Sequence, residues 1–159
     1  MGKRALDGLK RLLTLGGFLG LTACASGSAD GPGLREGRLR PCSPKPNCVC
    51  SEMTDPAHLV QPVAVTTENW PRIQKVARRA VENLGGRVER VADNYLWATF
   101  RSRIFHFVDD LELRFDEAEK AVHLRSAARL GYSDFGVNRK RIEALRKQLE
   151  EELRGPEHP

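Results

Sequence analysis

Residues 95–116, with the sequence YLWATFRSRIFHFVDDLELRFD, decide the fold. Apolar and polar residues alternate in both halves of this stretch, which is the pattern of half-buried β-strands. We predict strands over residues 95–104 and 107–116, joined by a tight turn at 105–106. Two further strands are expected over 87–92 and 121–128, and a turn at Asp93 and Asn94 follows the first of these.

The alternation also predicts the register of the two central strands. A tight turn places Phe100 opposite Leu111 on the apolar face, and Ser102 opposite Asp109 beside them. Burying an unpaired carboxylate costs several kcal/mol, so Asp109 needs a donor, from Ser102, backbone amides or an Arg. The sequence leaves open whether these groups form a structural network or a site at the end of the sheet.

The same register pairs charged residues on the other face of the sheet. Arg101 falls opposite Asp110, Thr99 opposite Glu112, and Glu112 opposite Arg125 of the last strand. The simplest interpretation is a solvated face with cross-strand ion pairs, and the alternative is that this face carries a polar site.

Two helices flank the strands. Residues 70–84 carry apolar side chains at helical spacing, with Thr66 or Thr67 as N-cap and Gly85-Gly86 as the stop. A second helix begins near residues 136–138, and its apolar stripe is Ile142, Leu145, Leu149 and Leu153. We therefore predict an α+β fold, an antiparallel sheet of about four strands with two helices packed on one face.

The N-terminus has the anatomy of a secretory signal. A basic stretch ends at Arg11, and an uncharged, largely apolar stretch runs from Leu12 to Ala23, which is short for a transmembrane helix. Residues 21–24, LTAC, resemble the lipobox of bacterial lipoproteins, which implies cleavage before Cys24 and lipidation of its thiol. Retention as a signal anchor without lipidation is the alternative.

The chain accordingly divides into a lipoprotein signal peptide over 1–23, a flexible tether over 24–40 and a single α+β domain over 41–154. The tether is rich in Gly, Ser and charge and has no periodicity. We expect the protein in the bacterial cell envelope, facing the periplasm, with the membrane as a partner through lipidated Cys24. By resemblance to the sorting rules of diderm bacteria, Ala25 in place of Asp favours the outer membrane.

The net charge of +5 raises the question of a nucleic-acid partner. Residues 1–23 hold four bases and one acid, which leaves 22 bases and 20 acids in the other 136 residues. Much of the excess charge therefore lies in the leader, and we expect no nucleic acid as a partner.

Export places the remaining cysteines in an oxidising compartment, where a disulfide is the usual state of paired thiols. Cys42 and Cys48 enclose a loop long enough to close, whereas Cys48 and Cys50 alternate and point apart in an extended chain. We predict a Cys42–Cys48 disulfide and an unpaired Cys50. A metal site of these three thiols and His58 matches no standard zinc module, so we expect no metal and no cofactor.

Polar residues collect on the strands and at the start of the last helix. Basic side chains beside the free amides of a helix start can bind an anion, and Arg grips carboxylate or phosphate with a planar fork. Asp134, or Asp110 with Glu112, is the internal alternative to an external anion. The predicted ligand-binding residues are Arg101, Arg103, Asp109, Asp110, Arg125, Ser126, Arg129, Asp134, Asn138, Arg139 and Arg141.

Six short motifs run along the predicted domain: PC at 41–42, PNCV at 46–49, RSR at 101–103, FVDDLE at 107–112, RS at 125–126 and GYSDFGVNRKRI at 131–142. In this order they resemble the bacterial family catalogued as domain of unknown function 1499, over residues 41–149. The resemblance implies envelope or membrane association and no established reaction. Members often have Ser at the position of Cys50, which supports Cys50 as the unpaired thiol.

Two classes of function remain. The first is a non-catalytic module that binds an anionic small molecule or an envelope protein. The second is an envelope hydrolase, which draws on Ser102, Ser126, Ser133, His106, His123, Asp109 and Asp110. The sequence has no GxSxG elbow or HExxH pair, and His123 and Ser126 face apart on their strand because their parity differs. We therefore favour the binding module.

Overall fold

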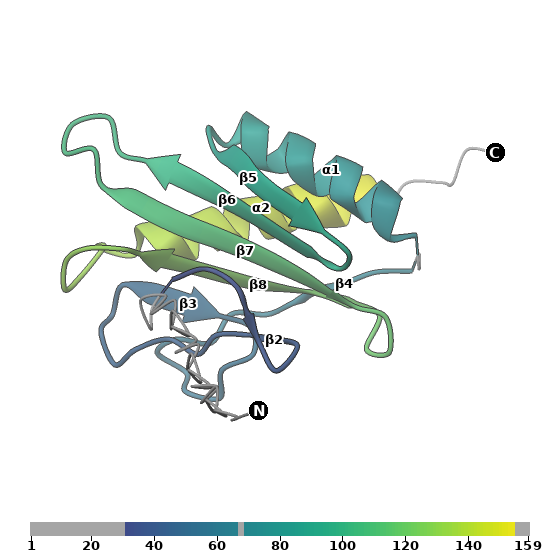
Figure 1. The fold of residues 1–159 in the computed structure, drawn as a ribbon, viewed down its shortest axis with the longest axis horizontal. Helices are drawn as coiled ribbons and strands as arrows, with labels where there is room; N and C mark the ends of the chain where they lie inside the picture. Colours follow the sequence, from purple (N-terminus) through teal and green to yellow (C-terminus); the bar gives the residue numbers. More distant parts are fainter. Residues whose placement is uncertain (1–30, 67–68, 155–159) are drawn as a thin grey trace, which may run out of the picture.

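A computed structural model describes residues 31–66 and 69–154 of the chain. The predicted signal peptide and Cys24 lie outside these residues. The described part is an α+β fold in which two helices cover one face of an antiparallel sheet (Figure 1). No helix in it is both long and apolar enough to cross a membrane.

The prediction of about four strands is wrong, because the main sheet has six. Its path runs β3–β8–β7–β6–β5, and β4 also pairs with β8. The four predicted strands are present as β5 (Arg87–Ala92), β6 (Tyr95–Arg101), β7 (Val108–Asp116) and β8 (Ala121–Ala128). The additional strands β3 (Cys48–Cys50) and β4 (Val63–Ala64) follow one another along the outer edge of β8. Two or three residues are too few to give an alternating pattern.

A second, two-stranded sheet lies near the N-terminus. It consists of β1 (Leu34–Arg35) and β2 (Arg38–Leu39), which form a hairpin within the segment that we predicted as a tether. Leu39 is buried against Cys50 and Tyr95, and residues 34–39 therefore belong to the folded structure.

The predicted register of β6 and β7 is wrong by two residues. Phe100 lies opposite Asp109, not Leu111. The two strands are joined by a wider loop than we expected, because the Ser102 amide donates to the Phe107 carbonyl and the Ser102 hydroxyl accepts from the Phe107 amide. A shift of two residues leaves every side chain on its predicted face. It also changes the polar partners, so that Thr99 and not Arg101 faces Asp110.

The helices α1 (Trp70–Asn83) and α2 (Val137–Leu153) pack on one face of the sheet, as predicted. The N-cap of α1 is Asn69, not Thr66 or Thr67, since the Asn69 side chain accepts the Arg72 amide at 3.1 Å. The predicted stripes form the core with the apolar face of the sheet: Ile73, Ala77, Ala80, Val81, Ile142, Leu145, Leu149, Leu153, Leu96, Leu111, Leu113 and Leu124 are all buried.

The other face of the sheet is not solvated, and that interpretation is wrong. Asp110, Glu112, Arg114 and Arg125 are buried there, beneath the part of the N-terminal segment that carries β1 and β2. The segment crosses the sheet on the side away from the helices (Figure 1). The structure therefore has three layers, with charged groups enclosed between two of them.

Candidate functional site

The sheet separates the predicted site residues into two groups. Arg125 and Ser126 are consecutive in β8, so their side chains point to opposite faces. One group, on the helix side, is Asp109, Ser126, Asn138 and Arg141. The other, beneath the N-terminal segment, is Asp110, Arg125 and Arg129. The predicted cluster is therefore not a single site.

The helix-side group is a closed network of hydrogen bonds. Arg141 donates to Asp109 at 2.7 Å and to the hydroxyl of Ser126 at 3.0 Å, and its guanidinium lies over the Phe100 ring. The fully buried Asn138 accepts from Ser126 and Arg141. Asp109 thus receives its donor from α2, and the network fixes that helix to the end of the sheet.

Two of the predicted residues, Asp134 and Arg139, hold loops in place. Asp134 accepts the amides of Gly136 and Asn138 at the start of α2. Arg139 donates to the carbonyls of Leu59 and Ala57, each at 2.8 Å. The helix start therefore uses its charged groups internally. Arg101 and Arg103 lie apart from both groups, at the exposed β6–β7 loop.

A buried ion pair joins β7 and β8 on the other face. Arg125 donates to Glu112 at 2.6 Å, and Glu112 also accepts from the Tyr95 hydroxyl and the Gly33 amide. This confirms the predicted pairing of Glu112 with Arg125. Burial, and then the adjacent Glu112 carboxylate, raise the pKa of Tyr95 well above its usual value. The Nε atom of Arg125 is buried and has no hydrogen-bond partner.

A second ion pair lies beside the first. Arg129 donates to both oxygens of Asp110, at 2.8 and 2.9 Å, and the Trp97 indole donates to the same carboxylate. These hydrogen bonds raise the pKa of Arg129. Asp110 is buried, whereas the Arg129 side chain is 44% exposed, so the pair reaches from the interior to the surface.

A cavity of about 420 Å³ opens at this place. It contains three cationic side chains, Lys45, Arg125 and Arg129, and one carboxylate, Asp110. Its lining residues are Gly31, Pro32, Ser43, Lys45, Asn47, Cys48, Trp97, Asp110, Arg125, Ala127, Ala128, Arg129 and Gly131. Lys45, Asn47 and Trp97 also line the cavity and were not among the predicted site residues. Lys45 and Asn47 carried one signal, since both lie within the loop that the predicted disulfide closes.

That disulfide is confirmed, because Cys42 and Cys48 are bonded. Two thiols of the alternative metal site are thereby consumed, and the His58 ring lies 2.9 Å from the Cys48 carbonyl. Cys50 is free and fully buried, and desolvation raises its pKa to about 11. A neutral, enclosed thiol is a poor nucleophile and a poor metal ligand.

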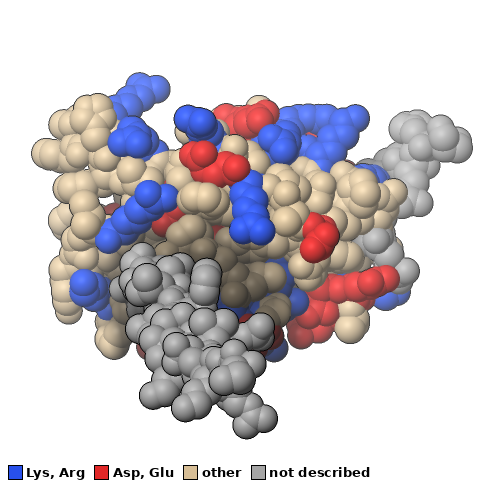
Figure 2. Space-filling view, in the orientation of Figure 1, with Lys and Arg blue, Asp and Glu red and all other residues tan. Residues whose placement is uncertain are grey.

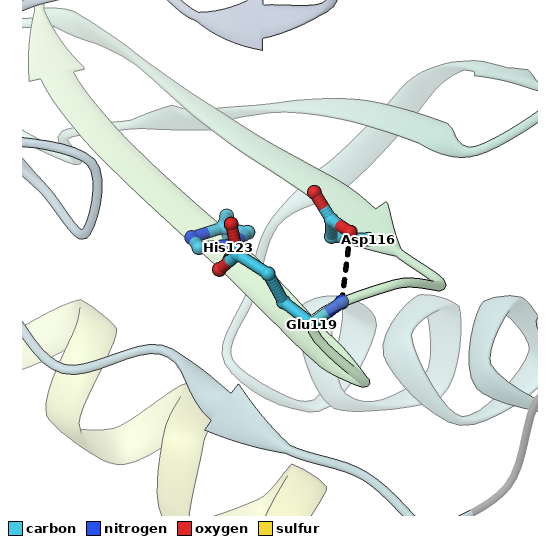
Figure 3. Close-up of side chains that lie close together, drawn as sticks. All are labelled: Asp116, Glu119 and His123. Carbon is cyan, nitrogen blue, oxygen red and sulfur yellow. Dashed lines mark hydrogen bonds and ion pairs between the residues drawn. The ribbon is translucent and has the colours of Figure 1, made fainter.

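Asp116, Glu119 and His123 form another cluster, at the turn between β7 and β8 (Figure 3). One ligand atom of each lies within 4.8 Å of the others. Asp116 is already paired, since it accepts from Arg114 at 2.8 Å and from the Glu119 amide, and these bonds lower its pKa. With a guanidinium this close, the cluster is explained as a hydrogen-bonded turn.

The predicted hydrolase residues are not assembled for catalysis. The Ser126 hydroxyl donates to the amide oxygen of Asn138, which is not a base. Ser102 and Ser133 accept amides of their own loops, and His123 lies on the opposite face from Ser126. Within the described ranges, no serine hydroxyl is hydrogen-bonded to a carboxylate. Ser51 is the one described serine whose hydroxyl contacts a His, namely His123, and this hydroxyl also accepts the Leu124 amide.

Comparison with known proteins gives one match. The family model described as "Protein of unknown function (DUF1499)" matches residues 38–149. No curated protein and no solved structure matches the chain.

Proposed function

The chain belongs to the DUF1499 family of proteins of unknown function, and we propose that it is a non-catalytic binding protein of the bacterial envelope whose cavity accepts an anionic ligand. One observation carries this proposal. The cavity holds three cations and a single carboxylate, and that carboxylate is already bound by one of the cations.

The free donor of Arg125 favours a ligand that carries an acceptor oxygen. Its side chain is 5% exposed, and it is held by Glu112 through one nitrogen while Nε has no partner. Leaving a buried donor unsatisfied is unfavourable, and an Arg whose position is already fixed loses little entropy on binding. Lys45 adds an exposed positive charge among the lining residues, and none of the described carboxylates forms an ion pair with it.

The size of the cavity restricts the ligand class. A volume of about 420 Å³ is at the small end of the range for small-molecule sites. A compact anion with a phosphate or carboxylate group fits both this volume and the fork geometry of Arg. A folded protein does not fit inside, although an acidic side chain of an envelope protein has the same chemistry.

The location forms the second part of the proposal. We infer a lipid anchor at Cys24 that holds the domain at the periplasmic face of the outer membrane. Residues 21–24, LTAC, and the apolar stretch before them support this. Labelled palmitate is expected in the full-length chain and not in Cys24→Ser. Incorporation that survives this substitution contradicts the anchor.

Titration with inorganic phosphate tests the cavity. The protein is Cys24→Ser, exported to a periplasm and purified without phosphate, with binding followed by calorimetry. We expect saturable binding that weakens at least tenfold in Lys45→Glu. Lys75→Glu is the matched control, because it makes the same charge change on the exposed face of α1.

Either of two results contradicts the proposal that the cavity binds an anion. One is no saturable binding of phosphate, together with no small anion retained in native mass spectrometry. The other is an equal loss of affinity in Lys45→Glu and Lys75→Glu, which indicates a general charge effect.

A further inference from the structure

Two loops expose an unusual amount of apolar surface. Phe135 is 92% exposed and Ile104 is 79% exposed, and both side chains are large. All the large apolar side chains that are exposed in the described residues lie in the β6–β7 loop or in the segment between β8 and α2, including the first residue of that helix. They are Ile104, Phe105, Phe107, Leu130, Tyr132, Phe135 and Val137.

Both loops lie at the same end of the sheet. Asp109 pairs with Ala128, and the Arg129 amide donates to the Val108 carbonyl, so β8 ends where β7 begins. The loops project together from the left edge of the sheet (Figure 1). The seven residues therefore lie on two loops at one end of the molecule, which we call the apolar end.

The backbone of these loops presents the side chains outward. His106 and Phe135 have positive φ angles of 54° and 53°, in the left-handed region that non-glycine residues rarely occupy. Phe135 is held there by its amide, which donates to the Ser133 hydroxyl. A bulky aromatic residue in this conformation gains no burial within the chain, so the fold does not account for it.

The charges beside the first loop of the apolar end are positive. Arg101 is the last residue of β6 and Arg103 lies in the β6–β7 loop, which contains no acid. Of the nearest acids, Asp109 pairs with Arg141, whereas Asp134 lies in the second segment and accepts two amides of α2. On the face seen in Figure 2, this end of the molecule is coloured tan and blue.

We propose that the apolar end inserts into the headgroup region of a bilayer that contains anionic lipid. Aromatic side chains favour the membrane interface, and Arg is attracted to anionic headgroups. Small protruding tips, rather than a broad flat face, are suited to shallow insertion.

The course of the chain gives independent support for a bilayer. Gly31 lines the same cavity as Arg129 and Gly131, so the described chain begins near the apolar end. Six residues lie between Gly31 and Cys24, and they span at most about 25 Å. A lipid anchor at Cys24 would therefore hold the apolar end toward the membrane. This orientation rests on the proposed anchor, whereas the proposed contact of the loops with lipid does not.

Quenching by brominated lipids tests the contact. Full-length Phe135→Trp and Ala118→Trp are each reconstituted in vesicles of brominated phosphatidylcholine with phosphatidylglycerol. Ala118 is the control, because it is exposed in the turn at the opposite end of the sheet. After subtraction of the signal from Trp70 and Trp97, we expect at least twofold stronger quenching at position 135. Equal quenching at both positions overturns the proposal.

Charge variants test the lipid class. In Phe135→Trp, the double change Arg101→Glu and Arg103→Glu is expected to remove the dependence of quenching on phosphatidylglycerol. Lys75→Glu with Arg78→Glu makes the same charge change on α1, and it should leave that dependence intact. An equal effect of both pairs overturns the role of the two arginines. The N-terminus is the same in all these chains, so a loss reports on the loops, while palmitate labelling reports on the anchor.

Discussion

Asn138 is fully buried, and its side chain is hydrogen-bonded at both ends. Its oxygen accepts from Ser126 and Arg141, and its nitrogen donates to the Asn47 carbonyl at 3.2 Å. One side chain thus joins α2, β8 and the loop before β3. A buried polar residue of this kind is tolerated because each of its groups has a partner.

Asn138→Ala is expected to lower the free energy of unfolding by about 1–3 kcal/mol, because it leaves the Ser126 hydroxyl and the Asn47 carbonyl without this partner. Urea denaturation measures the change. Lys147→Ala, on the exposed face of the same helix, should change stability by less than about 0.5 kcal/mol. Equal stabilities for the two variants contradict a structural role for the network.

Cys50 has a pKa of about 11 in the folded chain, against 9.0 for an unperturbed thiol. A folded pKa above the unfolded value means that the neutral thiol contributes stability below pH 9, and that this contribution is lost as the pH rises from 9 to 11. Over this range the free energy of unfolding of the parent chain should fall relative to that of Cys50→Ala. Urea denaturation at several pH values measures it, and a difference that is constant with pH contradicts the prediction.

At the scale of elements, long periodic segments could be predicted and short ones could not. The stripes of α1 and α2 and the alternation in β6, β7 and β8 each repeat several times, which fixes both their type and their buried face. The strands β3 and β4 depend instead on pairing with β8, and no local pattern encodes that. The width of the 102–107 loop depends on hydrogen bonds of Ser102, which alternation does not reveal.

The candidate site was predictable only in part, for a similar reason. Parity on β8 separated His123 from Ser126, but Arg125 and Ser126 were still predicted in one cluster. The charges of β7 and β8 identified Glu112 as the partner of Arg125, whereas Asp110 was paired with Arg101 instead of Arg129. The cover over these residues comes from a segment far away in the sequence. Glu52, for example, pairs with Arg114 across 62 positions. No spacing within either segment indicates that contact.

The loop closed by the disulfide is the element that shapes the cavity, because Ser43, Lys45 and Asn47 lie within it. Cys42→Ser with Cys48→Ser is expected to lower the free energy of unfolding by about 2 kcal/mol, since the open loop gains conformational freedom in the unfolded chain. Phosphate affinity should also fall, because Lys45 is no longer positioned. Calorimetry measures both quantities. If the variant binds phosphate as tightly as the parent chain, the disulfide loop does not contribute to the binding site.

On the scale of the whole molecule, the three layers differ in what holds them together. The helices pack on the sheet through a continuous apolar core. The part of the N-terminal segment that carries β1 and β2 instead meets the sheet through ion pairs and hydrogen bonds, with only a small apolar cluster around Cys50 and Tyr95. Glu112 receives the Gly33 amide, and Glu52 receives the Leu39 amide and the Arg114 guanidinium. Two buried carboxylates therefore connect this layer to the sheet.

Buried pairs of this kind contribute little net stability when intact, but breaking one is costly because a charge is left without its partner. Glu52→Ala leaves the Arg114 guanidinium, 5% exposed, with Asp116 as its remaining carboxylate. We expect a loss of about 3 kcal/mol in the free energy of unfolding. Glu119→Ala removes the carboxylate that pairs with His123, and this carboxylate is 53% exposed. The substitution should lower the free energy of unfolding by less than about 1 kcal/mol.

Hydrogen exchange then decides whether the N-terminal segment and the rest of the chain unfold as one unit. Since Glu52 lies in the cover and Arg114 in the centre of the sheet, we expect Glu52→Ala to lower the protection of amides in β7 and β8 as much as that of amides in β2. Loss confined to residues 31–47 and 51–58, which lie outside the main sheet, means instead that the cover opens alone. The cavity between cover and sheet then exists only in the closed state, and its phosphate affinity should fall in Glu52→Ala in proportion to the fraction of protein that remains closed.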